Sequence, residues 1–368
     1  RQLGELFAAA GKQLFLVGGS VRDAILDGPT NDLDFATDAR PGETVEILDG
    51  WASSIFRVGE QFGTIGAVHD GTTYEITTFR SDVYRQDSRK PVVAFSNDIE
   101  TDLSRRDFTV NAMAIRIPGE DPEEVPEMVD PYNGLADLAT QVIRTPLDPE
   151  VSFGDDPLRM LRLFRFVATL GFAPDPAAAG AVAAMRGRLS VISAERIRDE
   201  LSKLLIGPNV TDGLWGLLHT GLAGEFLPEL AALELEQDPQ HRHKDVLAHT
   251  VAVVAKTSPV EKLRLAALFH DIGKPATREF GPQGVSFHHH EVVGARMTRE
   301  RMRALRYPKD MVSDVSQLVF LHMRPHTYKM GWTDSAVRRY VRDAGDLLPL
   351  LNELVRCDVT TRSARRAR

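Results

Sequence analysis

The chain has 368 residues, a formal net charge of −8, 43% hydrophobic residues and 26% charged residues. This length suits two or three domains, and the composition is typical of a globular protein rather than a disordered one. The single cysteine, Cys357, excludes a disulfide within this sequence and a zinc site built on cysteine pairs, which favours a reducing cytoplasm. No apolar run approaches the roughly 18 residues of a membrane-spanning helix, so we expect no membrane partner.

The first 145 residues predict a mixed domain of strands and helices. The apolar run "QLFLVGG" (13–19) ends in two glycines, as a strand entering a turn does, and the following "SVRDAIL" predicts a helix with Ser20 as its N-cap. Apolar and polar residues alternate in three further segments, which predicts strands at "DLDFAT" (32–37), "GTIGAVHD" (63–70) and "TTYEITTF" (72–79).

From about residue 150 the pattern becomes helical. "DDPLRMLRLFRFVATLGF" (155–172) and "SAERIRDELSKLLIG" (193–207) have apolar residues at helical spacing, and a histidine-rich helical region follows from about residue 240. Arginine and lysine are concentrated at 103–108, 159–166 and 295–310. A locally basic face on an acidic protein can bind RNA, but mixed charge is equally typical of a solvated helix.

The segment "NDLDFAT" (31–37) places Asp32 and Asp34 two residues apart. Side chains at this spacing share one face of a strand, where two convergent carboxylates are a hard-oxygen site for Mg²⁺. A lone pair of this kind is more often part of a loop or a cap. An aspartyl-phosphatase motif is disfavoured because Ala36 occupies the position where that motif has Thr or Val.

Taken together, "LFLVGGSVRDAILDGPTNDLDFAT" (14–37) resembles the first motif of the class II tRNA nucleotidyltransferases and the related bacterial poly(A) polymerases. The resemblance implies a polymerase β-like head in which Asp32 and Asp34 bind catalytic Mg²⁺. It makes Glu75, in "YEITTFR" (74–80), the candidate third acid. It also implies that four residues lie close to the triphosphate: Gly18, Gly19, Arg22 and Asp23.

Two further motifs continue the resemblance. "RRDFTVNAMA" (105–114) is similar to the family's ribose-selecting motif, in which Arg105 and Arg106 can contact phosphate and Asp107 and Asn111 can bond to sugar hydroxyls. "DDPLRMLRLFRF" (155–166) resembles the motif that reads the incoming base. The resemblance assigns the reading of the base to the carboxylate of Asp156, as hydrogen-bond acceptor, and to the guanidinium groups of Arg159 and Arg162, as donors. We expect these residues to lie on one helix. An ordinary surface ion pair is the plain alternative.

The C-terminal region carries spaced histidines and aspartates. One buried histidine is usually a core residue, but an adjacent His-Asp pair with further His and Asp elsewhere favours a transition-metal site. The pattern resembles the HD domain, a helical metal-dependent phosphohydrolase fold. The resemblance gives one metal set of His249, His270, Asp271 and Asp358. Candidates for a second metal are His288, His290 and His322, whereas His241, His243 and His289 are expected at the surface.

We therefore predict an α+β protein with a small mixed sheet in a nucleotidyltransferase head (1–145), an all-helical neck (146–235) and an HD-type domain (236–368). Whether the HD-type domain is truncated at its C-terminal end stays open. The resemblance implies CCA addition to tRNA from CTP and ATP, with Mg²⁺ as cofactor and a transition metal as the HD candidate. The oligomeric state stays open.

Three alternatives stay open as well. A poly(A) polymerase would share the chemistry, but "GEQF" (59–62) stands where that family has a strongly basic stretch. The segment at 81–98 looks like the flexible loop of the family, which enzymes that add only CC lack. Its presence therefore argues against an enzyme that adds only CC, but an enzyme that adds only A stays possible. A protein of another class, an HD phosphohydrolase with an RNA-binding N-terminal half, is disfavoured by the complete set of head carboxylates.

Overall fold

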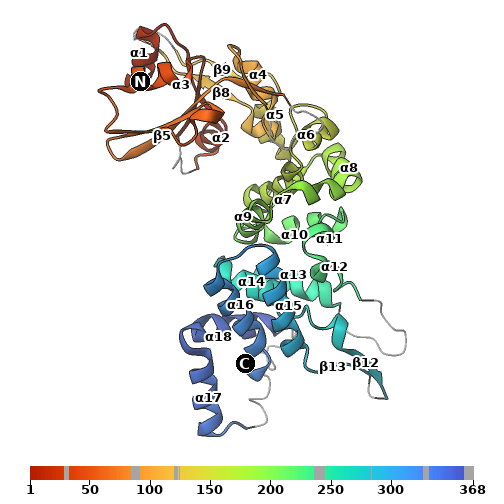
Figure 1. The fold of residues 1–368 in the computed structure, drawn as a ribbon. Helices are drawn as coiled ribbons and strands as arrows, with labels where there is room; N and C mark the ends of the chain where they lie inside the picture. The colour runs from red at the N-terminus through yellow and green to blue at the C-terminus, as the bar shows by residue number, and fades with distance from the viewer. Residues whose placement is uncertain are drawn as a thin grey trace. The chain divides into compact units, whose positions relative to one another are not determined.

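The computed structural model describes residues 1–28, 33–83, 92–119, 123, 125–235, 245–282, 284–325 and 331–359. The chain divides into two compact units (Figure 1). The first comprises Arg1–Asp156 and Ala173–Ala178, and the second comprises Pro157–Phe172 and Ala179–Arg368. The predicted division into three domains stays a prediction.

The first unit is built on a seven-stranded sheet of order β3-β4-β5-β2-β1-β8-β9. Its strands are β1 (Leu14–Val17), β2 (Leu33–Thr37), β3 (Ser54–Phe56), β4 (Thr64–His69), β5 (Thr72–Thr78), β8 (Ala114–Arg116) and β9 (Met128–Val129). The β2–β5 pair is parallel and the other pairs of this sheet are antiparallel. The predicted mixed sheet is thus confirmed.

Helices and short hairpins complete this unit. The helices are α1 (Gln2–Ala9), α2 (Gly19–Ile25), α3 (Pro41–Leu48), α4 (Ile99–Ser104), α5 (Gly134–Thr140) and α6 (Pro149–Asp155). Strands β6 (Arg80–Val83) and β7 (Val92–Phe95) form an antiparallel pair, and β10 (Val142–Ile143) pairs in parallel with β11 (Ala173–Pro174). The middle of the predicted flexible loop, 84–91, lies outside the described residues.

Alternating side chains of the sheet enter two different cores. Leu14 and Phe35 pack in one cluster with Phe7 of α1 and Leu48 of α3. Phe15 and Ala36 instead pack in a second cluster, with Phe79 and Leu103. Since neighbouring residues of a strand point to opposite faces, Asp34 shares the face of Ala36. This is the face on which the second cluster forms.

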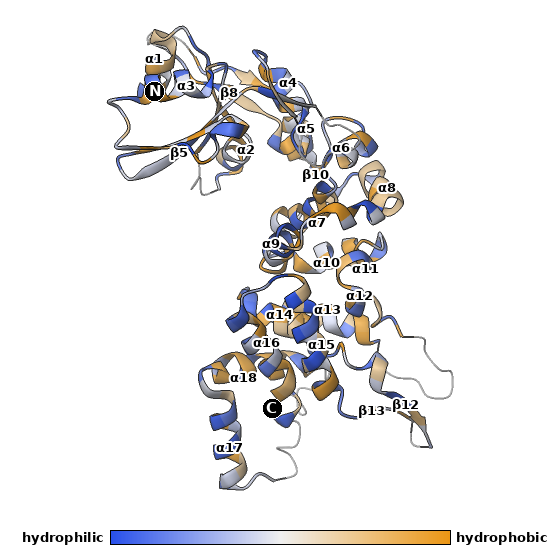
Figure 2. Ribbon diagram, in the orientation of Figure 1, coloured by the Kyte–Doolittle hydropathy of each residue, from blue (hydrophilic) through white to orange (hydrophobic). Residues whose placement is uncertain are grey.

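The second unit is helical. It contains α7 (Leu158–Leu170), α8 (Pro176–Met185), α9 (Ala194–Leu205), α10 (Val210–His219), α11 (Ala223–Phe226), α12 (Pro228–Ala231), α13 (Val246–Lys256), α14 (Glu261–Phe269), α15 (His290–Ala304), α16 (Lys309–Leu321), α17 (Asp334–Ala344) and α18 (Leu348–Asp358), with a hairpin of β12 (Arg278–Gly281) and β13 (Gly284–Phe287). The first residues of α8 belong to the other unit. Hydrophobic residues cover much of α7, interrupted by arginines at every third position from 159 to 165 (Figure 2).

A buried arginine joins the end of α9 to the corner between α13 and α14. Arg264 of α14 is only 5% exposed. Its guanidinium donates hydrogen bonds to the carbonyl oxygens of Leu205, Gly207 and Thr257. A carbonyl at a helix end has no partner within its own helix, so Arg264 satisfies groups that burial would otherwise leave unpaired.

The observed architecture agrees with the predicted α+β class, a small mixed sheet followed by helices. Within the described ranges, no helix combines the length and the apolarity needed to cross a bilayer.

Candidate functional site

Two of the predicted catalytic carboxylates occupy neighbouring strands at the same level. Asp34 of β2 is in register with Glu75 of β5 across the parallel pair. Residues paired in this way present their side chains on the same face of the sheet. Asp32, the third predicted carboxylate, lies outside the described residues.

The two carboxylates fit a hard divalent cation. Like charges placed directly opposite one another in a sheet destabilise it unless a positive group lies between them. Asp34 is half-buried and Glu75 is exposed, so a ligand from solvent can reach Glu75. The donor set offers oxygen atoms only, which is the type that Mg²⁺ prefers.

The glycine turn after β1 differs in detail from the prediction. Helix α2 begins at Gly19 with Gly18 as its N-cap, so Ser20 lies inside the helix rather than capping it. Gly18 has φ = +70°, a value that favours glycine. Ser20 is buried, and its Oγ accepts a hydrogen bond of 3.2 Å from the backbone N–H of Asp34. Ser20 therefore anchors the strand that carries a predicted catalytic residue.

A chain of polar side chains joins the first and second motifs. The guanidinium of Arg22 donates to Asp23 Oδ1 at 2.8 Å and to Asn111 Oδ1 at 2.5 Å. Asn111 Nδ2 in turn donates to Asp107 Oδ1 at 3.0 Å. The structure thus brings together four residues that the sequence assigned to nucleotide binding from segments 89 residues apart.

The paired arginines of the second motif share one buried carboxylate. Arg105 donates to Asp102 Oδ1 through Nε at 3.0 Å and Nη2 at 2.7 Å, and Arg106 Nη2 donates to Oδ2 at 3.2 Å. The side chain of Asp102 is 1% exposed. Burial would raise the pKa of Asp102, but the charges of Arg106 and Arg105 outweigh burial and hold that pKa below its usual value.

The predicted base-reading residues do not share one helix. Asp156 is extended, with φ = −135° and ψ = 99°, and ends α6, whereas α7 begins at Leu158. A proline at 157 disfavours helical conformation in the residue before it, which explains the difference. Arg159 and Arg162 do lie on α7, and Arg162 Nη1 contacts Glu200 Oε1 of α9 at 3.1 Å. Glu200 also pairs with Arg165, at 3.0 Å.

A cluster of histidines and aspartates lies within the second unit. Two groups of side chains could each hold a metal ion: His249 with His270 and Asp358, and Asp271 with His290 and His322. Within each group the ligand atoms lie within 4.8 Å of one another. His249 Nε2 lies 2.8 Å from Asp358 Oδ1, so residues 109 apart in sequence are brought into contact.

Three of the imidazoles are oriented by the main chain. The Nδ1 atoms of His270, His290 and His322 bond to the carbonyl oxygens of Ala267, Phe287 and Val319 at 2.7, 2.8 and 2.6 Å. A carbonyl can only accept, so each Nδ1 carries a proton and Nε2 is the ring atom left to bind a metal ion. The same three Nε2 atoms are buried and make no hydrogen bond among the described residues, and those of His270 and His290 lie 3.2 and 3.4 Å from carboxylate oxygens of Asp271. Buried ring nitrogens grouped around a carboxylate fit metal ligation.

The electrostatics of this cluster also favour a cation. Burial would lower the pKa of His270, but Asp271 and Asp358 outweigh it and raise the pKa to about 10. Burial lowers the pKa of His322 to about 3, which keeps this imidazole neutral. The negative potential that favours a proton on His270 equally favours a metal ion, and mixed nitrogen and oxygen donors suit a transition metal.

The structure places Asp271 between the two groups. Its Oδ2 lies 3.2 Å from His270 Nε2 and 3.8 Å from His249 Nε2, as the predicted first set requires, and its Oδ1 lies 3.4 Å from His290 Nε2. The grouping differs from the prediction in one respect. His288 is exposed and belongs to neither group, whereas His290, two residues later, is buried at the start of α15. His289 is exposed as expected, and His241 and His243 lie outside the described residues.

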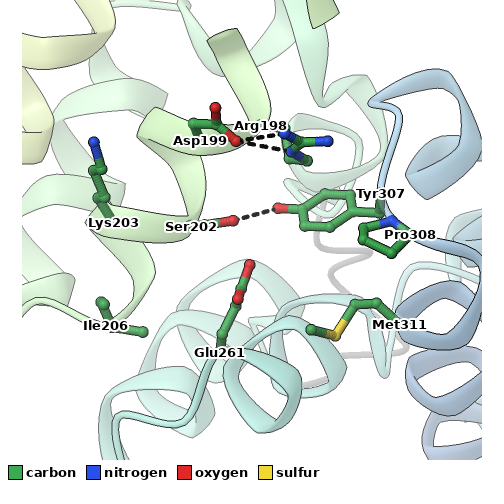
Figure 3. A pocket seen from close by; sticks show the side chains of 9 residues that line it. All are labelled: Arg198, Asp199, Ser202, Lys203, Ile206, Glu261, Tyr307, Pro308 and Met311. Atoms are coloured by element: carbon green, nitrogen blue, oxygen red, sulfur yellow. Dashed lines mark hydrogen bonds and ion pairs between the residues drawn. The ribbon is translucent and has the colours of Figure 1, made fainter. Parts of the chain in front are cut away.

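A separate groove of about 470 Å³ lies in the second unit (Figure 3). Its lining residues come from α9 and the residue after it, from α14, from the two residues before α16 and from α16 itself: Arg198, Asp199, Ser202, Lys203, Ile206, Glu261, Tyr307, Pro308 and Met311. The groove contains charges of both signs, and Tyr307 Oη and Ser202 Oγ are 3.0 Å apart across it. It includes none of the residues that the sequence assigned to a site.

Sequence analysis missed two residues of the head. Ser20 was predicted as a helix cap, and Asp102 was not singled out. The spacing of Asp102, three and four residues before the paired arginines, is the signal that could have found it, because residues at this spacing are neighbours on a helical turn.

Family models match three successive parts of the chain. Residues 14–144 match the Poly A polymerase head domain, residues 171–234 match the probable RNA and SrmB-binding site of polymerase A, and residues 240–361 match the HD domain. These matches define a nucleotidyltransferase head followed by an RNA-binding region and an HD domain. The chain thus has the succession of domains that its sequence motifs predicted, and it is similar to the tRNA nucleotidyltransferases and bacterial poly(A) polymerases with an HD domain.

Individual relatives agree with this assignment. A CCA-adding enzyme of Geobacillus thermodenitrificans (strain NG80-2) is 40% identical over 222 residues, which are 60% of this chain and 52% of the relative. A CCA-adding enzyme of Streptococcus gordonii is 40% identical over 236 residues, which are 63% of this chain and 56% of the relative. The chain thus spans about half the length of the curated relatives that it matches.

Solved structures extend the likeness to nearly the whole chain. The structure of the Bacillus stearothermophilus CCA-adding enzyme in complex with CTP matches 98% of this chain and 77% of its own, at a TM-score of 0.73 and 27% identity. A tRNA nucleotidyltransferase with a primer tRNA and an incoming ATP analog matches 96% of this chain and 94% of its own, at a TM-score of 0.67 and 21% identity. The second likeness concerns the fold alone.

Proposed function

We propose that this protein is a template-independent RNA nucleotidyltransferase that adds CCA to the 3′ end of tRNA from CTP and ATP. The observation that carries the proposal is the pairing of Asp34 with Glu75 on adjacent parallel strands, beside the Gly18 turn and the arginines of the second motif. The relatives named as CCA-adding enzymes support this substrate and product.

Asp32, Asp34 and Glu75 are the proposed ligands of Mg²⁺, which when bound would lower the pKa of the tRNA 3′-hydroxyl and neutralise the leaving pyrophosphate. Asp34 is held for this role by the hydrogen bond from its N–H to Ser20. The paired strands keep the two described carboxylates on one face, so little reorganisation is needed when a substrate arrives.

The other head residues bind and orient the nucleotide in this proposal. Arg105 and Arg106 contact the triphosphate, and Gly18 and Gly19 allow its close approach to the main chain. Arg22 and Asp23 lie beside the phosphates, and Asp107 and Asn111 bond to the ribose hydroxyls. The chain Arg22–Asn111–Asp107 supports this assignment, because it fixes the orientation of the sugar-selecting groups before the nucleotide binds.

Base selection is assigned to Asp156, Arg159 and Arg162. A carboxylate accepts from an exocyclic amine and a guanidinium donates to ring nitrogens and carbonyl oxygens, so such a set can distinguish bases without a nucleic-acid template. The link from Arg162 to Glu200 supports the proposal, since an ion pair at 3.1 Å restricts the guanidinium to one orientation. A reducing cytoplasm, where tRNA is the substrate, is the proposed compartment.

The experiment uses three tRNA transcripts, ending before CCA, after the first C and after CC. Each is incubated with Mg²⁺ and labelled CTP or ATP, and the products are sized on a gel. The proposal predicts completion to CCA and no further growth. Long A tails on any RNA would assign the protein as a poly(A) polymerase, and addition only to the transcript ending in CC would assign A-only addition.

The HD cluster favours a second activity, metal-dependent hydrolysis of phosphate esters or 2′,3′-cyclic phosphates. Three buried imidazole Nε2 atoms beside two aspartates support a transition-metal site in this part of the chain. The test is hydrolysis of 2′,3′-cyclic AMP by protein loaded with Mn²⁺, Ni²⁺ or Zn²⁺. Hydrolysis that disappears in Asp271→Asn supports the activity. Equal rates in wild type and variant would contradict it.

A further inference from the structure

A buried carboxylate beneath the second motif, that of Asp102, accepts hydrogen bonds from both of the motif's paired arginines. Asp102 lies on α4, and both of its oxygen atoms accept hydrogen bonds. Oδ1 accepts from Arg105 and, at 3.3 Å, from the backbone N–H of Arg80, while Oδ2 accepts from Arg106. The side chain is 1% exposed, so substrate cannot reach it, whereas Arg105 and Arg106 keep 17% and 19% of their side chains accessible.

Arg106, which is bonded to Asp102, also contacts the glycine turn after β1. A Cβ built on Gly18 would lie 2.7 Å from Arg106 Nη1, which shows that the guanidinium lies directly over the Gly18 main chain. The turn and the arginine thus meet at one place, and Asp102 fixes the arginine from behind. The same carboxylate holds the first residue of β6, where the chain leaves the strand that carries Glu75.

We infer that Asp102 is a positioning residue for phosphate binding, which orients the guanidinium groups of Arg105 and Arg106 toward the polyphosphate of the incoming nucleotide. The inference rests on the proposed nucleotidyl transfer. Its physical basis is the fixed geometry of a carboxylate bonded to two guanidinium forks, which restricts long side chains before a ligand binds. Two adjacent cations would otherwise repel, and the buried anion removes this cost.

The experiment compares Asp102→Asn with a matched control on the same helix. Asp98→Asn is the control, because Asp98 caps α4 through Glu100 and Thr101 and contacts neither arginine. Binding of inorganic pyrophosphate and of CTP is measured by calorimetry, and KM and kcat for CTP are measured with a tRNA substrate. We expect Asp102→Asn to weaken pyrophosphate and CTP binding about tenfold or more and to raise KM for CTP in parallel. Asp98→Asn should leave these constants unchanged.

Two further variants separate positioning from folding. Asp102→Glu keeps the charge and should restore part of the affinity. In an Arg106→Gln background, Asp102→Asn should weaken pyrophosphate binding less than it does alone, because residues that act through one another are not additive. A loss of thermal stability with unchanged binding constants in the folded protein, or full additivity in the double variant, would overturn the inference.

The binding measurement also distinguishes this inference from the proposed function. If wild type incorporates no nucleotide but pyrophosphate binding still depends on Asp102, the proposed function fails and the positioning role stands. If wild type incorporates nucleotides and Asp102→Asn binds pyrophosphate as wild type does, the positioning role fails and the proposed function stands.

Discussion

Asp34 and Glu75 are in register on two parallel strands, although 41 positions separate them in the sequence numbering. The register places both carboxylates on the face of the sheet where the glycine turn and the second motif also lie. A single sheet thereby collects the acids, and neither acid depends on a loop for its position.

Glu75→Gln tests whether this pairing matters for activity. The amide has nearly the same shape but is neutral and a poorer metal ligand, so nucleotide incorporation should fall about 100-fold or more while the melting temperature stays unchanged. Initial rates with labelled CTP measure the effect. Asp70→Asn is the matched control, because Asp70 is an exposed carboxylate in the β4–β5 turn, where asparagine tolerates the same positive φ. Equal rates for Glu75→Gln and Asp70→Asn would contradict the assigned role.

The HD cluster should hold metal independently of the head. Elemental analysis after dialysis should find metal bound to wild type, and less metal bound to His290→Ala, because this change removes a buried ring nitrogen of the second group. Removing the metal with a chelator should lower the melting temperature of wild type, since an ion that binds only the folded state stabilises it. Nucleotide incorporation by His290→Ala should match wild type. Unchanged metal content in this variant would exclude His290 as a ligand.

Gly273→Ala should damage the HD cluster without touching a ligand. A Cβ at this position would lie 2.2 Å from the carbonyl oxygen of His290 and 2.7 Å from the N–H nitrogen of Gly294, both main-chain atoms of α15. Accommodating it requires α15 to shift, which displaces His290, so metal content should fall. Gly180→Ala on α8 meets nothing within 4 Å and should leave metal content unchanged and raise stability by up to about 1 kcal/mol. Full metal content in Gly273→Ala would contradict the close packing seen here.

Arg264→Met should destabilise the helical unit. The substitution keeps much of the apolar stem but leaves the carbonyl oxygens of Leu205, Gly207 and Thr257 without their donor. Each unsatisfied buried acceptor costs about 1 kcal/mol or more, so the free energy of unfolding in urea should fall by about 3 kcal/mol. Arg303→Met, at an exposed position of α15, should change it by less than about 0.5 kcal/mol. Similar values for the two variants would show that the buried guanidinium contributes little.

Asp102 should make stability depend on pH in the acid range. Its pKa in the folded protein lies below the usual value of an unfolded aspartate, about 3.9, so its contribution to stability is complete above that pH and is lost as pH falls through the folded pKa. Between about pH 5 and pH 3 the free energy of unfolding of wild type should fall more steeply than that of Asp102→Asn. Parallel curves would mean that Asp102 has the same pKa in both states.

The sequence was most informative where the alternation of apolar and polar residues within one short segment determines its secondary structure. The alternation in 72–79 predicted β5, and the alternation in 32–37 predicted β2, whose Leu33 and Phe35 pack in an apolar core. The His-Asp pair at 270–271 stood out because charged groups in an apolar helix need a partner. Local patterns of this kind depend on residues a few positions apart, which a reader of the sequence can see.

Contacts between residues far apart in the sequence, and the exact ends of helices, were harder to predict. Ser20 was predicted as a helix cap, yet its hydroxyl accepts a hydrogen bond from the N–H of Asp34, because the cap of α2 is Gly18, two residues before Ser20. Asp156 was expected on a helix, but the following proline keeps it extended. Asp271 contacts His290 as well as His270, because α14 packs against α15 and α16, and spacing in the sequence alone cannot reveal this second contact.

The measurement that tests the central claim most directly is nucleotide incorporation into a tRNA transcript lacking CCA, by wild type, Asp34→Ala and Asp271→Asn. The account predicts that wild type and Asp271→Asn both complete CCA at similar rates, while Asp34→Ala, folded and still able to bind metal in its HD cluster, adds no nucleotide. Incorporation by Asp34→Ala at the wild-type rate would contradict the assignment of the head carboxylates as the catalytic site.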